Sequence, residues 1–475
     1  MLCAARIRLF VHSQSKMCIA CISCSIVKMV EEAGKVPLPL TATSLNITIN
    51  LWKQGFCYTP NGKRLRYRLT IEEGDWILQA QYRSTRAEIN LDHLGANYEA
   101  FRKALPADKL MLVCVKANAY GHGAVEISKE MERLGADYLS VAFLDEALEL
   151  RHAGVGLPIL VLGYTPPEAV QTAWEHDISL TVFSEEVLEG IRRLDRQGSE
   201  RKLKVHIKID SGMGRLGLLP GEAALAFVQQ AHELEQVLLE GMYTHFARAD
   251  EEDKSYTLLQ YDRFRGVADA LREQGITIPI IHTGNSAATI DTPSLSPNMV
   301  RIGISIYGLY PSDEVNRQVI ELLPVLSLKT AVVYTKTLPP GWGVSYGTRY
   351  VTSSEERIGT LPIGYADGYS RMLSGKVEVL IRGRRVPVLG TICMDQCMVS
   401  LQSFAEDAEE IQTGEEVVLI GQQSGEIIAA DELASKLGTI HYEVICMIAD
   451  RVPRVYMRDH VPVVRVNSLL PTHWN

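Results

Sequence analysis

Eight short apolar runs, each followed by a segment with helical spacing, constrain the fold more than any other feature of the sequence. The runs cover residues 110–116, 138–142, 158–162, 178–182, 203–209, 239–245, 279–283 and 298–302. Intervening segments such as 145–152 and 184–196 carry apolar residues at helical intervals. Parallel strands that alternate with crossover helices in this number predict an α/β fold, a (β/α)8 TIM barrel.

An open, doubly wound sheet is the alternative for a strand and helix repeat. That fold usually carries a glycine-rich dinucleotide-binding loop after an early strand. Gly121-His122-Gly123 lacks the spacing of such a loop. The barrel is therefore the preferred prediction.

The pattern changes on both sides of this repeat. Beyond about residue 322, strand-like runs at 325–333, 357–361, 377–381, 386–388 and 416–420 are joined by short turns that contain Gly or Pro. Before the repeat, residues 87–91 alternate like a strand, and we expect Asp92 to cap a helix that continues to Lys103. We predict an N-terminal extension with little order (1–85), a cofactor-binding barrel (86–321) and a mainly β C-terminal domain (322–475).

The stretch 113–123 places a lysine where the first barrel strand ends. Lys116 follows the apolar run, and the chain then turns through small residues into a helical pattern near Ala124. A lysine at this edge is partly removed from water, which favours the neutral amine that forms Schiff bases or moves protons. A lysine that simply reaches solvent is the alternative. Tyr120 and His122 in the same short loop favour a functional site.

Other polar residues gather where the later strands end, which is where barrel enzymes place their catalytic groups. They are Lys208, Asp210, His245, His282 and Arg301. Asn285-Ser286 and Gly303-Ile304 follow the seventh and eighth strands, where such barrels bind phosphate. An ordinary turn explains either loop alone, but the two together predict a phosphate site.

The stretch around Lys116 closely resembles the cofactor-lysine signature of alanine racemases, and the resemblance extends from about residue 86 to the C-terminus. It implies that Lys116 carries pyridoxal 5'-phosphate as a Schiff base and that the enzyme interconverts L-alanine and D-alanine for peptidoglycan synthesis. Racemisation needs an acid/base group on each face of the substrate. The resemblance implies Lys116 and Tyr346 as these two bases, with Tyr346 supplied by the partner subunit of a head-to-tail homodimer.

The same resemblance assigns the supporting residues. Arg301 would face the pyridine nitrogen of the cofactor, oriented by His245, and Lys208 matches a lysine that is often carbamylated and then holds Arg215 against the substrate. A satisfied core histidine, a solvated lysine and a strand-edge aromatic remain the simpler explanations of His245, Lys208 and Tyr346. The remaining assignments are Tyr120, Asn285, Ser286, Gly303, Ile304 and Tyr442 for the cofactor, Met394 for the substrate carboxylate, and Tyr365 and Asp395 for the entrance and its support.

Three related functions are alternatives to an alanine racemase. A racemase of broader range, or one specific for serine or lysine, would share the fold, but bulky tyrosines at the entrance favour a small substrate. A single-barrel carrier of pyridoxal phosphate would not need the β domain. A related decarboxylase with a barrel and a β domain is less favoured, because the Lys116 loop and Tyr346 follow the racemase pattern.

Charge and cysteine content exclude several other classes. The chain of 475 residues has a formal net charge of −9 and no basic run, so we expect no nucleic-acid or membrane partner. Scattered cysteines in the predicted globular part are typical of a reducing compartment, which predicts a cytoplasmic protein. They are Cys114, Cys393, Cys397 and Cys446.

The first residues give weaker signals. Cys18, Cys21 and Cys24 have no second ligand pair at zinc-finger spacing, so no metal site is expected. The apolar stretch 17–27 is too short to span a bilayer. We interpret this region as an extension or as sequence upstream of a start such as Met29, with a signal peptide as the less favoured alternative.

Overall fold

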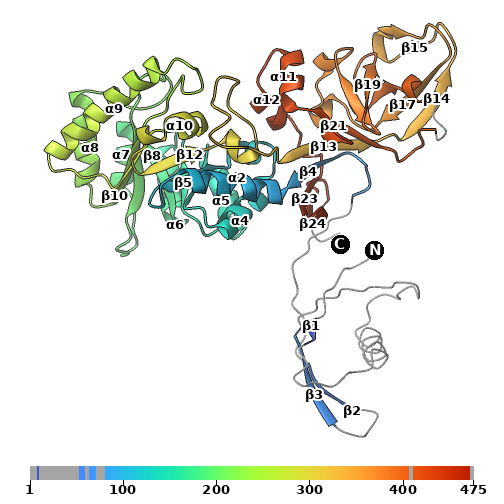
Figure 1. Cartoon of the computed structure of the whole chain (residues 1–475). Helices are drawn as coiled ribbons and strands as arrows, with labels where there is room; N and C mark the ends of the chain where they lie inside the picture. Colours follow the sequence, from blue (N-terminus) through green and yellow to red (C-terminus); the bar gives the residue numbers. More distant parts are fainter. Residues whose placement is uncertain (1–7, 10–52, 59–63, 71–80, 406–409, 471–475) are drawn as a thin grey trace. The chain divides into compact units, whose positions relative to one another are not determined.

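The computed structural model describes residues 8–9, 53–58, 64–70, 81–405 and 410–470 (Figure 1). The chain forms two units, residues 1–77 and 78–475. In the first unit, β1 (Arg8–Leu9), β2 (Lys53–Tyr58) and β3 (Arg64–Thr70) pair antiparallel in the order β1-β3-β2. These strands were not expected from the sequence. The interpretations of residues 17–27 and of Cys18, Cys21 and Cys24 fall outside the described residues.

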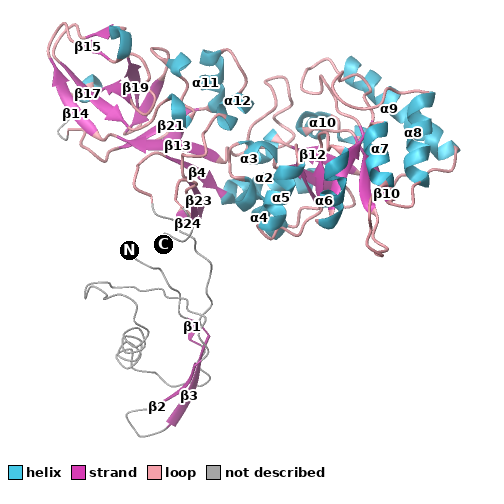
Figure 2. Cartoon of the chain, turned by 180° about the vertical axis from the view of Figure 1, so that it is seen from behind, coloured by secondary structure: helices cyan, strands magenta, loops and turns pink. Residues whose placement is uncertain are grey.

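The second unit contains the predicted barrel. Its strands are parallel and close in the order β5 to β12, with β12 paired to β5 (Figure 2). They are β5 (Leu110–Cys114), β6 (Tyr138–Val141), β7 (Ile159–Val161), β8 (Ile178–Val182), β9 (Leu203–Lys208), β10 (Val237–Tyr243), β11 (Ile280–His282) and β12 (Met299–Ile302). Each of the eight predicted runs contains or overlaps one of these strands, so the predicted fold class is confirmed.

Helices surround the barrel strands in Figure 2. They are α2 (Leu91–Ala104), α3 (Lys116–Tyr120), α4 (Ala124–Leu134), α5 (Leu144–His152), α6 (Val170–Glu175), α7 (Glu185–Arg192), α8 (Glu222–Glu233), α9 (Ser255–Glu273) and α10 (Ser286–Asp291), with short 3-10 turns η1 (Pro167–Ala169), η2 (Pro293–Leu295) and η3 (Ile304–Tyr307). All residues of β7, β8 and β12 are buried. Burial on both faces explains why these strands read as continuous apolar runs in the sequence.

The helix α2 begins two residues earlier than predicted, and its cap is different. The side chain of Asn90 accepts hydrogen bonds from the backbone N–H groups of Asp92 and His93, both at 3.0 Å. The prediction that Asp92 is the cap is therefore wrong. Asp92 lies in the first turn, where its negative charge interacts favourably with the positive end of the helix dipole.

A mainly antiparallel sheet forms the C-terminal part, in the order β14-β17-β20-β19-β18-β21-β13-β4-β23-β24, with β22 paired to β21. Its strands are β4 (Arg86–Asn90), β13 (Leu326–Ala331), β14 (Tyr334–Leu338), β17 (Glu356–Leu361), β18 (Glu378–Ile381), β19 (Arg384–Leu389), β20 (Cys397–Ser400), β21 (Glu416–Gln423), β22 (Glu426–Ile428), β23 (Arg454–Arg458) and β24 (Val461–Val466). A separate hairpin joins β15 (Gly343–Val344) to β16 (Tyr350–Val351). The other elements are α11 (Ala430–Leu437), α12 (His441–Cys446) and the 3-10 turns η4 (Tyr346–Thr348), η5 (Tyr365–Asp367), η6 (Arg371–Leu373) and η7 (Gln402–Phe404).

The strand β4 belongs to this sheet, although we expected it at the start of the barrel domain. It pairs antiparallel with β13 and parallel with β23. Its residues alternate, with Ala87 and Ile89 fully buried and the others half-buried. Such alternation suits a sheet with one covered face better than a barrel strand. Among the described residues, no helix is both long enough and apolar enough to cross a bilayer.

Candidate active site at the carboxyl ends of the barrel strands

Lys116 stands at the start of an unusual turn that follows β5. The next four residues, Ala117 to Tyr120, have φ angles of 52–53°. The left-handed conformation costs roughly 1–2 kcal/mol for each residue other than glycine. Four such residues in a row persist only where the surrounding structure stabilises them, and strain of this kind is typical of functional sites.

Side chains from the barrel and from the segment before β23 hold this turn. The backbone N–H of Ala117 donates to Oε1 of Glu146 at 2.7 Å. Asn118 accepts from the N–H of Ala124 at 2.8 Å and donates to Oδ1 of Asp450 at 3.1 Å. The first part of the turn is therefore fixed by three side chains, one of which belongs to the C-terminal part of the chain.

The strand β23 contacts the end of the same turn. Arg454 Nε donates to the carbonyl of Gly121 at 3.1 Å, and Tyr456 Oη donates to the carbonyl of His122 at 2.9 Å. A Cβ atom at Gly123 would lie 1.8 Å from Tyr456 Oη. The close packing of β23 thus requires glycine at this position.

Arg301, on β12, is buried among neutral acceptors. Its Nη2 donates to the carbonyls of Thr244 at 2.9 Å and Thr283 at 3.0 Å and to Nδ1 of His245 at 3.1 Å, while Nη1 donates to Nδ1 of His282 at 3.1 Å. Burial, followed by the charge of Arg301, lowers the pKa of both histidines well below the usual 6.5. Both are therefore neutral at physiological pH.

Arg301 and His245, predicted as neighbours, are thus in contact. His282 was not assigned to the site, although a polar residue at the end of the seventh strand was a signal for it. Within the described part of the chain, Nε of Arg301 forms no hydrogen bond with protein.

Lys208 ends β9 beside these groups, with 6% of its surface exposed. Its Nζ lies 4.1 Å from the centre of the Tyr243 ring, and Cζ of Arg301 lies 5.1 Å from the centre of the same ring. Burial, and then the charges of Arg301 and Arg215, lower the pKa of Lys208 well below 10.5. The site therefore brings together buried cationic groups and the face of one tyrosine.

The loop that leads to Arg215 is organised by Asp210. The Asp210 carboxylate accepts from the backbone N–H groups of Gly212, Met213, Gly214 and Arg215 at 2.8–3.1 Å. Burial alone would raise the pKa of Asp210, but these four donors lower it below its usual value. The carboxylate serves the loop backbone, and the structure gives it no hydrogen bond to Lys208.

The loops after β11 and β12 meet as predicted for an anion site. Ser286 Oγ accepts from the N–H groups of Gly303 at 2.9 Å and Ser305 at 3.4 Å. The hydroxyl hydrogen of Ser286 is therefore left to donate to another acceptor. A Cβ atom at Gly303 would lie 2.7 Å from Tyr120 Oη. Ser305 Oγ is buried without a partner among the described residues, and the sequence analysis missed this residue.

The other predicted residues of this region lie close by. Asn285 accepts from the N–H of Ala288 at 3.1 Å and caps α10, and Ile304 begins η3. The ring of Tyr442, on α12, has its centre 6.3 Å from that of Tyr120. Tyr442, the second base and the entrance residues all belong to the C-terminal part of the chain.

Tyr346 is 73% exposed and follows Ser345, which has a φ of 66°. It begins η4, with one residue separating it from β15, which Figures 1 and 2 show at the end of the C-terminal domain far from the barrel. A single chain therefore does not bring Tyr346 to Lys116.

The loops with Met394, Tyr365 and Asp395 are joined by backbone and ionic contacts. The Tyr365 N–H donates to the carbonyl of Cys393 at 3.0 Å, and Met394 is exposed. Asp395 pairs with Arg451 at 2.5 Å, and Arg451 also pairs with the buried carboxylate of Asp367 at 2.7 Å. Asp395 is thus anchored to the segment that follows α12.

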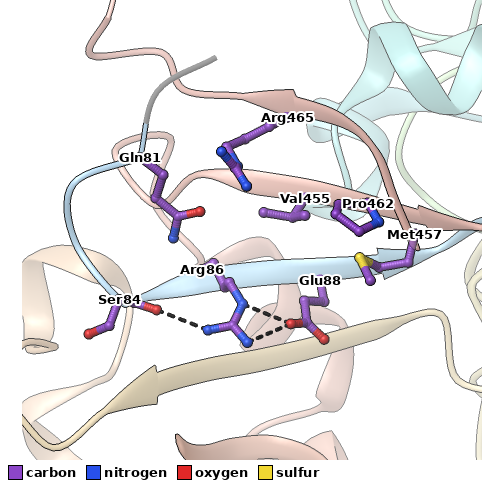
Figure 3. A pocket seen from close by; sticks show the side chains of 8 residues that line it. All are labelled: Gln81, Ser84, Arg86, Glu88, Val455, Met457, Pro462 and Arg465. Atoms are coloured by element: carbon purple, nitrogen blue, oxygen red, sulfur yellow. Dashed lines mark hydrogen bonds and ion pairs between the residues drawn. The ribbon is translucent and has the colours of Figure 1, made fainter. Parts of the chain in front are cut away.

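A surface pocket of about 330 Å³ lies elsewhere, over β4, β23 and β24 (Figure 3). Arg86 and Glu88 form an ion pair at 2.7 Å in it, and Arg86 also donates to the carbonyl of Ser84 at 3.3 Å. None of the predicted site residues lines this pocket. Among the described residues, no group of three or more His, Cys, Asp or Glu side chains is arranged to hold a metal ion.

Comparisons with known proteins give one consistent result. Residues 89–311 match the family model described as alanine racemase, N-terminal domain, and residues 325–456 match that of the alanine racemase C-terminal domain. The chain is 46% identical over 371 residues to an alanine racemase of Methanococcus maripaludis, which covers 78% of this chain and 98% of the relative. It is 45% identical over 386 residues to that of Clostridium novyi, which covers 81% and 98%.

Solved structures agree with these relatives. The alanine racemase of Clostridium difficile 630 superposes with a TM-score of 0.78 at 44% identity, over 82% of this chain and all of that chain. A histidine racemase of Leuconostoc mesenteroides superposes with a TM-score of 0.73 at 28% identity, over 81% of this chain and all of that chain.

Proposed function

Since the chain belongs to the alanine racemase family of isomerases, we propose that it interconverts L-alanine and D-alanine with pyridoxal 5'-phosphate. One observation carries the proposal. The strained Lys116 turn, the buried Arg301 and the Ser286 and Gly303 loops all lie at the carboxyl ends of the barrel strands, next to one another in the closed barrel.

The described residues fit this cofactor. The hydroxyl hydrogen left on Ser286 and the unpartnered hydroxyl of Ser305 suit a phosphate, and Tyr120 fills the space beside Gly303. Nε of Arg301 is available to an acceptor such as a ring nitrogen, and Lys116 supplies the amine for a Schiff base. When bound, pyridoxal phosphate withdraws electrons from the substrate and makes its Cα proton removable.

Arg301 would offer a hydrogen bond while keeping its proton, because a guanidinium stays charged in proteins. It would therefore leave the ring nitrogen of the cofactor unprotonated and moderate electron withdrawal. His245 and His282 are neutral acceptors, so they hold the guanidinium by hydrogen bonds and do not neutralise its charge.

Two proton carriers would work on opposite faces of the substrate. Lys116 would serve one face and Tyr346 of a second copy the other, so that one removes the Cα proton while the other returns a proton to the opposite side. The exposure of Tyr346 and its distance from the barrel support a homodimer in which each site uses residues of both subunits. Arg215 and the Met394 backbone would bind the substrate carboxylate, and Tyr365 and Tyr442 would narrow the entrance.

Lys208 has the properties of a lysine that reacts with carbon dioxide. Its lowered pKa favours the neutral amine, which can form an N–C bond to carbon dioxide and release one proton. The resulting carbamate would place an anion beside Arg215. It would replace the repulsion of Lys208 by the charges of Arg301 and Arg215 with attraction.

The substrate is the least constrained part of the proposal, since a histidine racemase shares this fold. The tyrosines at the entrance support alanine over larger amino acids. We also propose a role in the supply of D-alanine for peptidoglycan. The free thiols of the described residues support a reducing compartment such as the cytoplasm.

The test combines an absorbance spectrum with a chiral assay on L-alanine, L-serine, L-lysine and L-histidine. The wild-type enzyme should bind pyridoxal phosphate covalently and form D-alanine fastest. Lys116→Ala should lose the covalent absorbance band and reduce the rate by at least about a thousandfold, because it removes both the Schiff base and one proton carrier. Lys129→Ala, which removes a surface lysine paired with Glu126, is the matched control and should change neither.

An unchanged spectrum in Lys116→Ala would overturn the assignment of this lysine. A covalent cofactor without racemisation of alanine would overturn the proposed substrate.

A further inference from the structure

A line of hydrogen bonds leaves Arg301 and crosses the barrel interior. Arg301 Nη1 contacts Nδ1 of His282 at 3.1 Å, and Nε2 of His282 contacts Nδ1 of His206 at 2.9 Å. Nε2 of His206 then contacts Oε2 of Glu240 at 3.1 Å. The line therefore joins a group proposed to face the cofactor to a carboxylate on β10.

The chemistry of the two ends fixes the direction of every hydrogen in this line. A guanidinium can only donate, so Nδ1 of His282 must accept, and its hydrogen must lie on Nε2. His206 must then accept at Nδ1 and carry its own hydrogen on Nε2. A carboxylate can only accept, and Glu240 is placed to receive that hydrogen.

The same argument excludes a charged His206, even though it contacts a carboxylate. An imidazolium carries hydrogens on both nitrogens. A charged His206 would donate from Nδ1 to Nε2 of His282. The hydrogen of His282 would then lie on Nδ1 and face the guanidinium of Arg301, which is also a donor. The arrangement is satisfied only when both histidines are neutral and carry their hydrogen on Nε2.

Local structure around Glu240 is adapted to this contact. The pairing register of β9 and β10 shifts between Leu239 and Gly241, so that Glu240 forms a β-bulge, a device that redirects a side chain. A Cβ atom at residue 241 would lie 2.3 Å from Nδ1 of His206, so glycine makes room for the imidazole. Ser179 Oγ also donates to Oε2 of Glu240 at 3.1 Å.

The charge state of Glu240 agrees with its role as an acceptor. Burial alone would raise its pKa, but the hydrogen bonds from His206 and Ser179 and the charge of Lys204 act to lower it. The carboxylate is therefore ionised at physiological pH.

We propose that Glu240 is a positioning residue, which anchors His206 and His282 as Nε2–H tautomers and through them aims the guanidinium of Arg301. The tautomers follow from the protein contacts alone. The consequence for the cofactor rests on the role proposed above for Arg301.

Nitrogen NMR of the holoenzyme labelled with ¹⁵N-histidine tests the tautomers directly, with signals assigned by single histidine substitutions. Both His206 and His282 should be neutral at pH 7 with the hydrogen on Nε2. A hydrogen on Nδ1 of either residue, or a charged His206, would overturn the proposal. This readout does not depend on racemisation, so it separates the inference from the proposed function.

Two variants of similar size test the role of Glu240. Glu240→Gln keeps an acceptor oxygen and should preserve both tautomers. Glu240→Met removes the acceptor, so His206 should lose its single tautomer, and the dissociation constant of pyridoxal phosphate should rise about tenfold or more, as for a lost charge-assisted hydrogen bond. The absorbance maximum of the bound cofactor should move in Glu240→Met and stay in Glu240→Gln.

Glu130→Met is the matched control, because Glu130 is a buried carboxylate of the barrel that pairs with Arg133 and Arg458. It should leave both tautomers and the cofactor spectrum unchanged. If Glu240→Met behaves in the same way, Glu240 does not position Arg301 and the proposal fails.

Discussion

His122 is a buried side chain in the Lys116 turn that makes the stability of the protein depend on pH. Its Nδ1 lies 3.0 Å from the carbonyls of Ala119 and Tyr120, and its ring packs on that of Tyr307 at 4.4 Å between centres. Burial lowers the pKa of His122 to about 4. Burial thus keeps this histidine neutral in the folded protein down to about pH 4.

The consequence is a loss of stability in mild acid. In the unfolded chain this histidine is protonated near pH 6.5, whereas in the folded chain it is protonated only near pH 4. The free energy of unfolding is therefore unaffected by this histidine above pH 6.5 and falls as the pH drops from 6.5 to 4. His122→Asn keeps a donor without the titration, and should reduce the pH dependence of the unfolding free energy by up to about 3 kcal/mol.

Thermal unfolding at several pH values between 7 and 4.5 measures this effect. His232→Asn, at an exposed position of α8, is the control and should unfold like the wild type. Parallel curves for wild type and His122→Asn would contradict the expectation.

Several site residues could be chosen from the sequence because a strand end and a motif coincide there, as for Lys116, Arg301 and Ser286. The strand end also pointed to His282, but its contact with Arg301 and the roles of Ser305 and Glu240 could not be predicted. Their roles depend on contacts between strands and loops that are distant in sequence. The spacing of residues along the chain does not indicate which side chains meet inside a barrel.

At the scale of elements, the barrel strands were predictable because burial on both faces leaves an uninterrupted apolar run. The strand β4 was predicted but assigned to the barrel domain, and β23 was not predicted. Their partners are determined by a sheet that joins the beginning and the end of the described unit. The left-handed turn after β5 could not be predicted either, since alanine and tyrosine disfavour this conformation and the single asparagine that tolerates it does not imply four such residues in a row.

Packing of β23 on this turn predicts the effect of one methyl group. In Gly123→Ala the alanine must adopt a φ of 98°, and its Cβ would lie against Tyr456 Oη. The substitution should therefore destabilise the protein by about 1–3 kcal/mol and weaken cofactor binding. Tyr456→Phe in the same chain removes the clashing oxygen and should recover part of the loss, which a double-mutant cycle measures.

Gly266→Ala is the matched control within α9, where a Cβ atom meets open space. It should stabilise the helix by about 0.5–1 kcal/mol. Equal effects of the two alanine substitutions would show that β23 does not clamp the turn.

At the scale of the whole molecule, the separation of Tyr346 from the barrel makes the proposed site a property of two chains. Exposed Trp342, Tyr346, Tyr365 and Met394 lie on the C-terminal domain, where a second copy can cover them. No feature of a single sequence states that two residues act on one substrate from different subunits. That assignment came from the resemblance alone.

Mixing two inactive variants tests the shared site. In a heterodimer of Lys116→Ala and Tyr346→Phe, one site carries both changes and the other carries neither. Random pairing of equal amounts should therefore restore about a quarter of the wild-type activity per chain. Co-expression with two different affinity tags isolates the heterodimer for the assay, and each homodimer serves as a control.

A heterodimer as inactive as its parents would show that each site is built within one chain.

The contacts between β23 and the Lys116 turn also set an order of events during synthesis. His122 leaves the ribosome 334 residues before Tyr456, the residue that closes over it. The barrel can be translated in full while the lysine still lacks its clamp. A chain that ended before Arg454 would contain every barrel residue of the site and still lack the two side chains that hold the Lys116 turn, so we expect a competent site only after the last strands have been made.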